Sequence, residues 1–263
     1  MVLKNPNKTA DKLDDLIEVL RKLRAPGGCN WDRAQTAESL VPYLLEETYE
    51  VIEAIEEKDT ESLKEELGDL TLHILFQAEL SQEKDNFTMT DVLTDISEKL
   101  IRRHPHVFRN EKNSSLVNQN ASWEKAKQKE KKRKNLLDGV PQNLPALTRA
   151  RRIQEKASHV GFDWKEIEPI WDKVYEEIEE LKEAVTSGDK ESVKDELGDL
   201  FFSLVNLGRF LDVSGEDALR MTIRKFENRF SKVELELKSR GSSMENSTLD
   251  EMDEIWNDIK KGE

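Results

Sequence analysis

Two sets of acidic residues with the same spacing are the part of this sequence best suited to chemistry. In the first set, Glu47 and Glu50 are three residues apart, and Glu66 and Asp69 repeat that separation further along the chain. Residues three apart lie on one face of a helix, so two packed helices can bring the four carboxylates together. Every member of the set has an acidic counterpart 130 residues later: Glu177, Glu180, Glu196 and Asp199.

Carboxylates gathered in this way predict a site for a divalent cation. Several at one place repel one another and stay protonated unless positive charge is near. Hard ions prefer oxygen ligands, so Mg²⁺ is the first expectation and Mn²⁺ the second. An ordinary solvated face is the alternative for the acids of residues 46–53. Glu66 and Asp69 argue against it, because they lie in the densely apolar segment LKEELGDLTLHILFQAELSQ, where an unpaired carboxylate is costly.

The composition indicates that helices position these acids. Charged residues make up 37% of the 263 residues and hydrophobic residues 36%, while Pro and Gly number only 7 and 11. This is too apolar for a disordered acidic chain and too poor in turn residues for a β-sandwich, so the predicted fold class is all-α. Apolar periodicity predicts an amphipathic helix over residues 13–23, further helices beginning near Pro42 and covering 63–82, and a fourth over 90–104.

An internal repeat divides the chain. Pairs outside the acidic sets recur at nearly the same separation: Trp31-Asp32 with Phe162-Asp163, and Lys99 and Arg103 with Lys225 and Arg229. The sequence therefore predicts two tandem helical modules, residues 1–135 and 136–263, with a hinge at the segment LLDGVPQNLPAL.

Composition and charge exclude several classes of protein. The single cysteine, Cys29, rules out an internal disulfide and a cysteine-based zinc site. The net charge of −14 argues against a nucleic-acid partner, although the basic run 125–134 can be interpreted either as a nucleic-acid patch or as a solvated helix or linker. No stretch resembles a signal peptide or a membrane span, so we expect a soluble, cytoplasmic protein without membrane contact.

Several further segments accompany the acidic sets along nearly the whole chain: GGCNWDRAQT, YLLEETYEVIEAI, EELGDL, KLIRRHPHVF, LPALTRARRIQEKASHVGFDW, KVYEEIEELKEA, DELGDLFFSLVNLGR, RKFENRF and MDEIW. A lone ExxE motif carries little information, whereas this ordered set is highly specific. In this ordered set of segments the sequence resembles the MazG nucleoside triphosphate pyrophosphohydrolases. The resemblance implies a dimer of helical-bundle modules that hydrolyses NTPs or dNTPs to the monophosphate and pyrophosphate with a bound metal.

The resemblance also implies roles for individual residues. The metal ligands would be the four acids of the second set and, in the first module, their counterparts. The nucleotide contacts would be Lys173, Val174, Tyr175, Glu176, Glu177, the stretch before Glu196, Lys225, Phe226, Glu227, Asn228, Arg229 and Trp256. Charge and spacing, rather than the resemblance, make three of these residues candidates for catalysis. Lys225 and Arg229, one helical turn apart, would neutralise the leaving group, and Glu176 would accept the proton of the attacking water.

Alternatives stay open for several of these residues. Lys225 and Arg229 could form surface ion pairs, and Trp256 could be a core or interface residue. His73 could be a further ligand or a histidine hydrogen-bonded in the core. Asn206 could bind a base edge or form a helix–helix hydrogen bond. For the whole chain, the alternatives to an enzyme are a non-catalytic nucleotide-binding protein and a helical scaffold.

Overall fold

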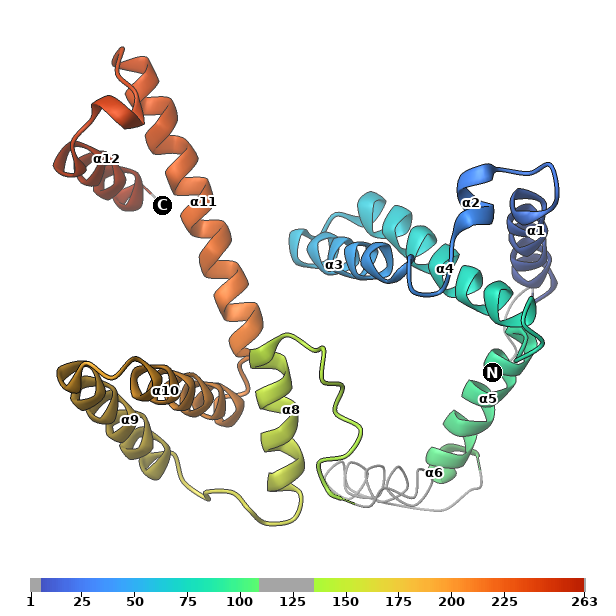
Figure 1. Cartoon of the computed structure of the whole chain (residues 1–263), viewed down its shortest axis with the longest axis horizontal. Helices are drawn as coiled ribbons and strands as arrows, with labels where there is room; N and C mark the ends of the chain where they lie inside the picture. The colour runs from blue at the N-terminus through green and yellow to red at the C-terminus, as the bar shows by residue number, and fades with distance from the viewer. Residues whose placement is uncertain (1–5, 109–134, 263) are drawn as a thin grey trace. The chain divides into compact units, whose positions relative to one another are not determined.

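The computed structural model describes residues 6–108 and 135–262, and the regular structure in these ranges is helical (Figure 1). The predicted all-α class is confirmed. The chain divides into two compact units, residues 1–116 and 117–263. The predicted boundary between residues 135 and 136 stays a prediction. Within the described ranges, no helix combines the length and the apolar character that crossing a membrane requires.

The first unit is built on two long helices, α3 and α4, that pack side by side as a hairpin (Figure 1). Its helices are α1 (Pro6–Arg24), α2 (Asn30–Ala34), α3 (Val41–Glu57), α4 (Thr60–Gln82), α5 (Met89–Arg103) and α6 (Pro105–Phe108). Buried side chains from α1, α4 and the residue before α3 form its core: Leu20, Leu40, Leu75, Phe76 and Leu80.

The second unit repeats this hairpin with α9 and α10, against which α8 packs. Its elements are α8 (Ala146–Ser158), α9 (Glu168–Ser187), α10 (Lys190–Phe210), α11 (Gly215–Ser239), the short 3-10 helix η1 (Met244–Asn246) and α12 (Leu249–Lys261). One core cluster joins α9 to α10 through Ile170, Val174 and Leu207. A second joins α11 to α12 and includes Val233 and Ile255.

The turn between the two long helices has the same design in both units. After α3, Lys58 has a φ of 60°, and Asp59 then caps α4 by accepting hydrogen bonds from two backbone N–H groups at 3.0 and 3.1 Å. After α9, Gly188 has a φ of 75°, and Asp189 caps α10 with one such bond at 3.2 Å. Glycine adopts this left-handed conformation without the strain that a lysine carries. Because the turns match, the acids of the first helix face those of the second at the same positions in both hairpins.

Part of the segment predicted as a hinge is anchored to α8. The ammonium group of Lys156 is buried and donates to the carbonyl oxygens of Leu136 and Asp138, both at 3.1 Å. A buried charge requires such acceptors because its desolvation is costly. The predicted loop 110–120 and the basic run 125–134 lie outside the described residues.

Both hairpins carry apolar side chains that their own units leave exposed. On α10 these are Leu197, Phe201 and Leu204, each between 40 and 50% exposed. Leu67 and Ile74 occupy the corresponding positions on α4 and are 47 and 46% exposed. Apolar stripes of this kind are typical of surfaces that bind another protein surface.

Candidate metal and nucleotide site

The hairpin of α9 and α10 brings three of the predicted metal ligands together. One carboxylate oxygen from each of Glu177, Glu196 and Asp199 lies within 4.8 Å of the others. Glu177 is only 4% exposed, Glu196 is half-buried and Asp199 is exposed, so the group opens to the surface. Glu180 is not one of these three, but it lies close enough to Glu177 and Glu196 to interact with them. Burial and the charges of these two glutamates raise the pKa of Glu180.

The hairpin of α3 and α4 repeats the arrangement with Glu47, Glu66 and Asp69. Burial, followed by the charges of Glu50 and Asp69, raises the pKa of Glu47 to about 7. Burial and the charge of Glu50 also raise the pKa of Glu66. Each hairpin therefore holds three of its four predicted ligands in one group, and the fourth, Glu50 or Glu180, lies close enough to interact electrostatically with two of them.

A lysine distinguishes the second acidic group from the first. Lys173 Nζ lies 2.8 Å from Oε1 of Glu176 and 2.8 Å from Oε1 of Glu177, and these hydrogen bonds raise the pKa of Lys173. The other oxygen of Glu177, Oε2, is buried and has no hydrogen-bond partner among the described residues. A buried carboxylate oxygen without a partner is costly, and a hard cation would satisfy it. The residues present therefore fit a divalent metal ion.

In the first unit, Tyr43 occupies the position that Lys173 has in the second. Its ring stacks on His73 with the centroids 6.3 Å apart, and Nε2 of His73 lies 3.8 Å from Oε1 of Glu47. Burial lowers the pKa of His73, so its ring is neutral near pH 7. Nδ1 of His73 is buried without a partner in the described part of the chain. The histidine thus lies at the edge of the acidic group and adds no positive charge to it.

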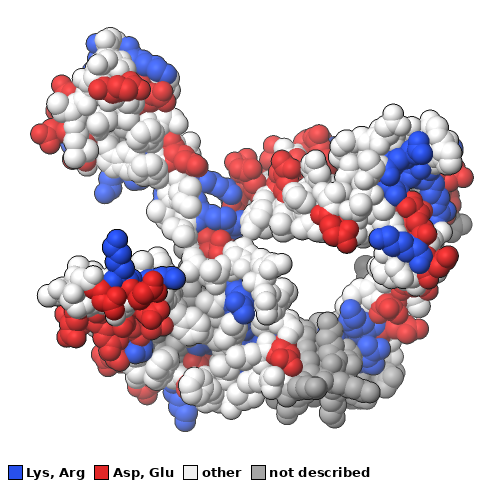
Figure 2. Space-filling view, viewed as in Figure 1, with Lys and Arg blue, Asp and Glu red and all other residues white. Residues whose placement is uncertain are grey.

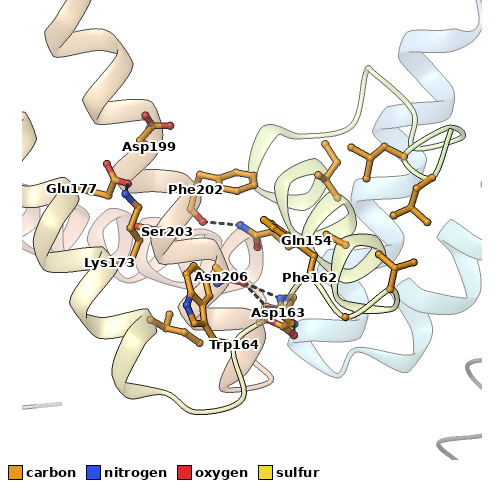
Figure 3. Close-up of a pocket in the computed structure, with 18 residues that line it drawn as sticks. Gln154, Phe162, Asp163, Trp164, Lys173, Glu177, Asp199, Phe202, Ser203 and Asn206 are labelled. Carbon is orange, nitrogen blue, oxygen red and sulfur yellow. Dashed lines mark hydrogen bonds and ion pairs between the residues drawn. The ribbon is translucent and has the colours of Figure 1, made fainter.

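A cavity of about 900 Å³ extends from the second acidic group along α10 (Figure 3). Glu177 and Asp199 lie at one end, and Asn206 and Trp164 at the other. Most of the lining between them is apolar and aromatic. This size and lining are typical of sites for small molecules, which combine apolar walls with a few polar groups.

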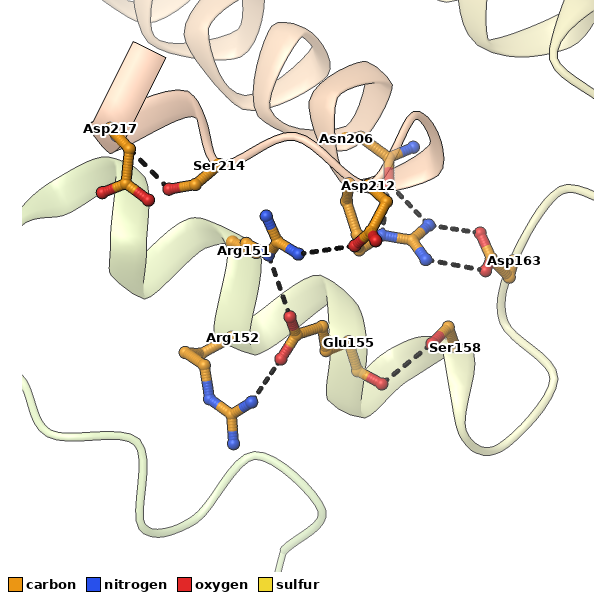
Figure 4. Close-up of polar contacts among 10 residues, drawn as sticks. Arg151, Arg152, Glu155, Ser158, Asp163, Asn206, Asp212, Ser214 and Asp217 are labelled. Atoms are coloured by element: carbon orange, nitrogen blue, oxygen red, sulfur yellow. Dashed lines mark hydrogen bonds and ion pairs between the residues drawn. The ribbon is translucent and has the colours of Figure 1, made fainter. Parts of the chain in front are cut away.

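Arg209, which is paired with Asp163, holds Asn206 at the far end of this cavity (Figure 4). Arg209 donates from Nε and Nη2 to Oδ1 of Asn206, at 3.0 and 2.7 Å. The same guanidinium group donates from Nη1 and Nη2 to the two carboxylate oxygens of Asp163, at 3.0 and 2.5 Å. The oxygen of Asn206 is therefore bonded to a residue of its own helix, while Asp163 fixes the arginine from the loop before α9.

Gln154 on α8 is a lining residue that the sequence did not single out. Its Nε2 donates to the carbonyl oxygen of Phe202 at 2.8 Å, and its Oε1 is buried without a hydrogen-bond partner among the described residues. A break in the repeat could have drawn attention to this end of the cavity. Asn206 and Arg209 correspond to Phe76 and Glu79 in the first unit, so an amide and a cation of α10 are replaced on α4 by an aromatic ring and an acid.

The predicted nucleotide contacts on α11 and α12 form a separate group. Cζ of Arg229 lies 5.7 Å from the ring of Trp256, and the ring of Phe226 lies 5.2 Å from it. Trp256 is half-buried and packs against the core cluster of α11 and α12, while three neighbours are exposed: Lys225, Glu227 and Asn228. The described residues that line the cavity include none from α11 or α12.

The remaining predicted contacts lie on α9 beside Lys173. Val174 is 3% exposed and belongs to the core, so its side chain contributes packing. Tyr175 is exposed and stacks on Trp171 with the centroids 6.1 Å apart. Glu176 is exposed and paired with Lys173.

Comparison with known proteins identifies the family. The sequence profile of the MazG nucleotide pyrophosphohydrolase domain matches residues 35–108 and again 166–234. The chain belongs to the MazG family. Each MazG match contains one acidic group, which confirms the predicted pair of tandem modules, and the second match also contains residues 225–229. Gln154, Asp163 and Trp256 lie outside both matches.

Several relatives align along nearly the whole chain. A protein of Thermotoga maritima named nucleoside triphosphate pyrophosphohydrolase/pyrophosphatase MazG is 47% identical, over 95% of this chain and 96% of its own length. The nucleoside triphosphate pyrophosphohydrolase of Escherichia coli K12 is 42% identical, over 96% of this chain and 98% of its own length. The uncharacterized protein YabN of Bacillus subtilis is 44% identical, over 93% of this chain and 51% of its own length.

Proposed function

We propose that this chain hydrolyses nucleoside triphosphates, NTPs or dNTPs, to the monophosphate and pyrophosphate, and that the reaction requires Mg²⁺ or Mn²⁺. The observation that carries the proposal is the position of Glu177, Glu196 and Asp199 at one end of a cavity of about 900 Å³. The names of the relatives from Thermotoga maritima and Escherichia coli support the same reaction.

The three acids, with Glu180 beside them, would hold the cation. A bound divalent ion supplies positive charge for the phosphate oxygens and makes a nearby water more acidic. Lys173 adds a second positive charge next to Glu177. Glu176 binds Lys173 through Oε1, which leaves Oε2 to accept the proton of the attacking water as a general base.

Two cations on α11 would act on the leaving group where the phosphates extend beyond the cavity, since the described lining of the cavity includes no residue of α11. Lys225 and Arg229 lie one turn apart, so both can approach the same phosphate group. Their charges would neutralise the pyrophosphate as it leaves, and Trp256, which contacts Arg229, would position that guanidinium group or stack on the substrate.

We place the reaction in the second unit. Lys173 lies beside the buried glutamate there, whereas Tyr43 takes its place in the first unit. The cavity next to the second acidic group ends at Asn206, and the corresponding Phe76 is 2% exposed within the core of the first unit. A core aromatic at that position leaves less space for a nucleoside.

The two acidic groups provide matched variants for the test. We expect Glu196→Gln and Asp199→Asn each to lower Mg²⁺-dependent pyrophosphate release on the order of a hundredfold, because a ligand of the cation is lost. The corresponding changes in the first unit, Glu66→Gln and Asp69→Asn, should leave most of the activity. The assay scores monophosphate and pyrophosphate from a panel of NTPs and dNTPs, with EDTA as a blank. Near-wild-type release by the second-unit variants would show that the site is misassigned.

We also propose that the chain forms a homodimer through the exposed stripe of α10. Three apolar side chains at helical spacing, Leu197, Phe201 and Leu204, are 40 to 50% exposed, as expected of an interface between copies. Phe201→Gln should therefore shift the mass measured by light scattering from two copies to one. Leu249→Gln removes an apolar side chain that is 76% exposed on α12 and should leave the mass unchanged. A wild-type monomer would contradict the proposal.

A further inference from the structure

We propose that Gln154 and Asn206 bind the nucleobase of the substrate in the cavity of the second unit, an inference that rests on the proposed triphosphate hydrolysis. Both side chains line the cavity and both are 7% exposed. Each is a buried amide, and a buried amide requires hydrogen-bond partners for both its oxygen and its nitrogen.

Gln154 contributes an acceptor. Its amide nitrogen donates to the carbonyl oxygen of Phe202 at 2.8 Å, and only the nitrogen can do this, so the orientation of the amide is defined. The oxygen Oε1 is buried and has no partner among the described residues. A buried acceptor without a donor is destabilising, and an N–H group of a ligand in the cavity would satisfy it.

Asn206 contributes a donor. Two N–H groups of Arg209 bind its Oδ1, at 3.0 and 2.7 Å, and leave Nδ2 as the half of the amide that can bind a ligand. The pair of hydrogen bonds from Arg209 to Asp163 keeps the guanidinium group in this position (Figure 4). Arg209 and Asp163 are therefore positioning residues, and they act on the ligand through Asn206.

The other lining residues indicate a flat aromatic ligand. Phe162, Trp164 and Phe202 line the cavity and are 83, 44 and 44% exposed, so their faces are free for stacking (Figure 3). Aromatic side chains stack on nucleobases of any sequence. One acceptor and one donor match the polar edge of a base, which presents an N–H group beside an acceptor. The acidic group at the opposite end of the cavity is then on the side of the phosphates.

The first unit supports this assignment by contrast. Its hairpin repeats the turn and the three acids, but Phe76 and Glu79 replace Asn206 and Arg209. Phe76 is buried in the core, and Glu79 accepts two hydrogen bonds from Arg21 at 2.8 Å each. The amide and the arginine therefore belong to the unit with the cavity, whereas Asp163 has a counterpart in Asp32 of the first unit.

The test compares natural triphosphates with analogues whose bases carry no N–H group. The substrates are ATP, GTP, CTP and UTP, with purine riboside triphosphate and 2-pyrimidinone riboside triphosphate as the donor-free analogues. In the wild-type chain we expect kcat/KM for the best natural base to exceed that of the analogue with the same ring system by about tenfold or more, mainly through KM. Gln154→Met should reduce this ratio to about one, because the acceptor is gone.

Gln77→Met is the matched control. Gln77 lies on α4, and its Nε2 donates to the carbonyl oxygen of Ala37 at 3.0 Å, as that of Gln154 does to Phe202. This variant should keep the wild-type ratio. Asn206→Asp is the second variant, since it keeps an oxygen for Arg209 but replaces the donor by an acceptor. It should raise KM for every substrate of the panel and leave kcat near wild type.

The outcomes separate this inference from the proposed function. If the wild-type chain releases pyrophosphate but its ratio is near one, or if Gln154→Met keeps the wild-type ratio, the base assignment is wrong and the hydrolysis stands. An unchanged KM in Asn206→Asp would equally overturn the role of the asparagine. If no triphosphate yields pyrophosphate, both proposals are wrong. Melting curves of each variant confirm that it is folded.

Discussion

Replacing Glu47 by glutamine should stabilise the first unit when no divalent cation is bound. Burial and the neighbouring acids raise the pKa of Glu47 from 4.5 to about 7, so the folded unit binds its proton more tightly than the unfolded chain. The cost of ionisation is absent below pH 4.5, grows between pH 4.5 and 7, and is complete above pH 7. A shift of this size corresponds to at most ~3 kcal/mol. Because the side chain is 18% exposed and water screens it, we expect Glu47→Gln to increase the free energy of unfolding of the first unit by roughly 1–2 kcal/mol at pH 8.

Amide hydrogen exchange in peptides of α3 and α4, measured in EDTA, reports this local stability. At pH 8 the amides of Glu47→Gln should be better protected than those of the wild-type chain. At pH 5 the two should be nearly equally protected. Mg²⁺ should shrink the difference, because it stabilises the ionised group. Glu177→Gln is the matched control. Lys173 already neutralises that carboxylate at 2.8 Å, so its loss should weaken protection in α9 and α10. An equal gain of protection in Glu47→Gln at both pH values, or any gain of protection in Glu177→Gln, would refute the reasoning.

Three further predictions concern stability. Thr88→Ala removes the capping box in which Thr88 Oγ1 accepts from the N–H of Asp91 at 3.3 Å, and urea titration should show a loss of about 1 kcal/mol; a loss under a few tenths would contradict this. Arg24 donates to Glu83 and lowers the pKa of that carboxyl, so the pair stabilises the fold above about pH 4.5 and the effect fades as pH falls. Glu83→Gln should accordingly lower the melting temperature more at pH 7 than at pH 3.5. Lys156→Met leaves two carbonyl oxygens without their ammonium donor, and limited proteolysis should cleave residues 135–145 faster than in wild type; unchanged cleavage would show that the anchor is dispensable.

Helices and acidic groups could be predicted because both depend on local spacing. Apolar residues at helical intervals and an Asp before α4 and α10 define where those helices begin, whatever packs against them. Acids three residues apart then share a helix face, and the repeat at 130 residues makes two such groups. The convergence of Glu66 and Asp69 with Glu47 follows once the two helices form a hairpin.

The far end of the cavity could not be predicted in this way, because its residues come from segments that only the fold brings together. Gln154, Asp163 and Asn206 lie on α8, on a loop and on α10. The sequence named Asn206 as a possible ligand of a base edge but left a helix–helix hydrogen bond as the alternative, and it gave no signal for Gln154. Their free hydrogen-bonding atoms become evident only when the partners of the other half of each amide are known.

The sequence alone determined the all-α class, the duplicated module and the acids that can hold a cation, since these follow from composition and from spacings of a few residues. Tertiary structure decided which acid is buried, where Lys173 lies, and which buried polar atoms have no partner among the described residues. The physical reason is that burial and charge depend on contacts between segments distant in the chain. Glu47 and Glu177 have the same place in the repeat, yet one lies beside a neutral histidine and the other beside an ammonium group.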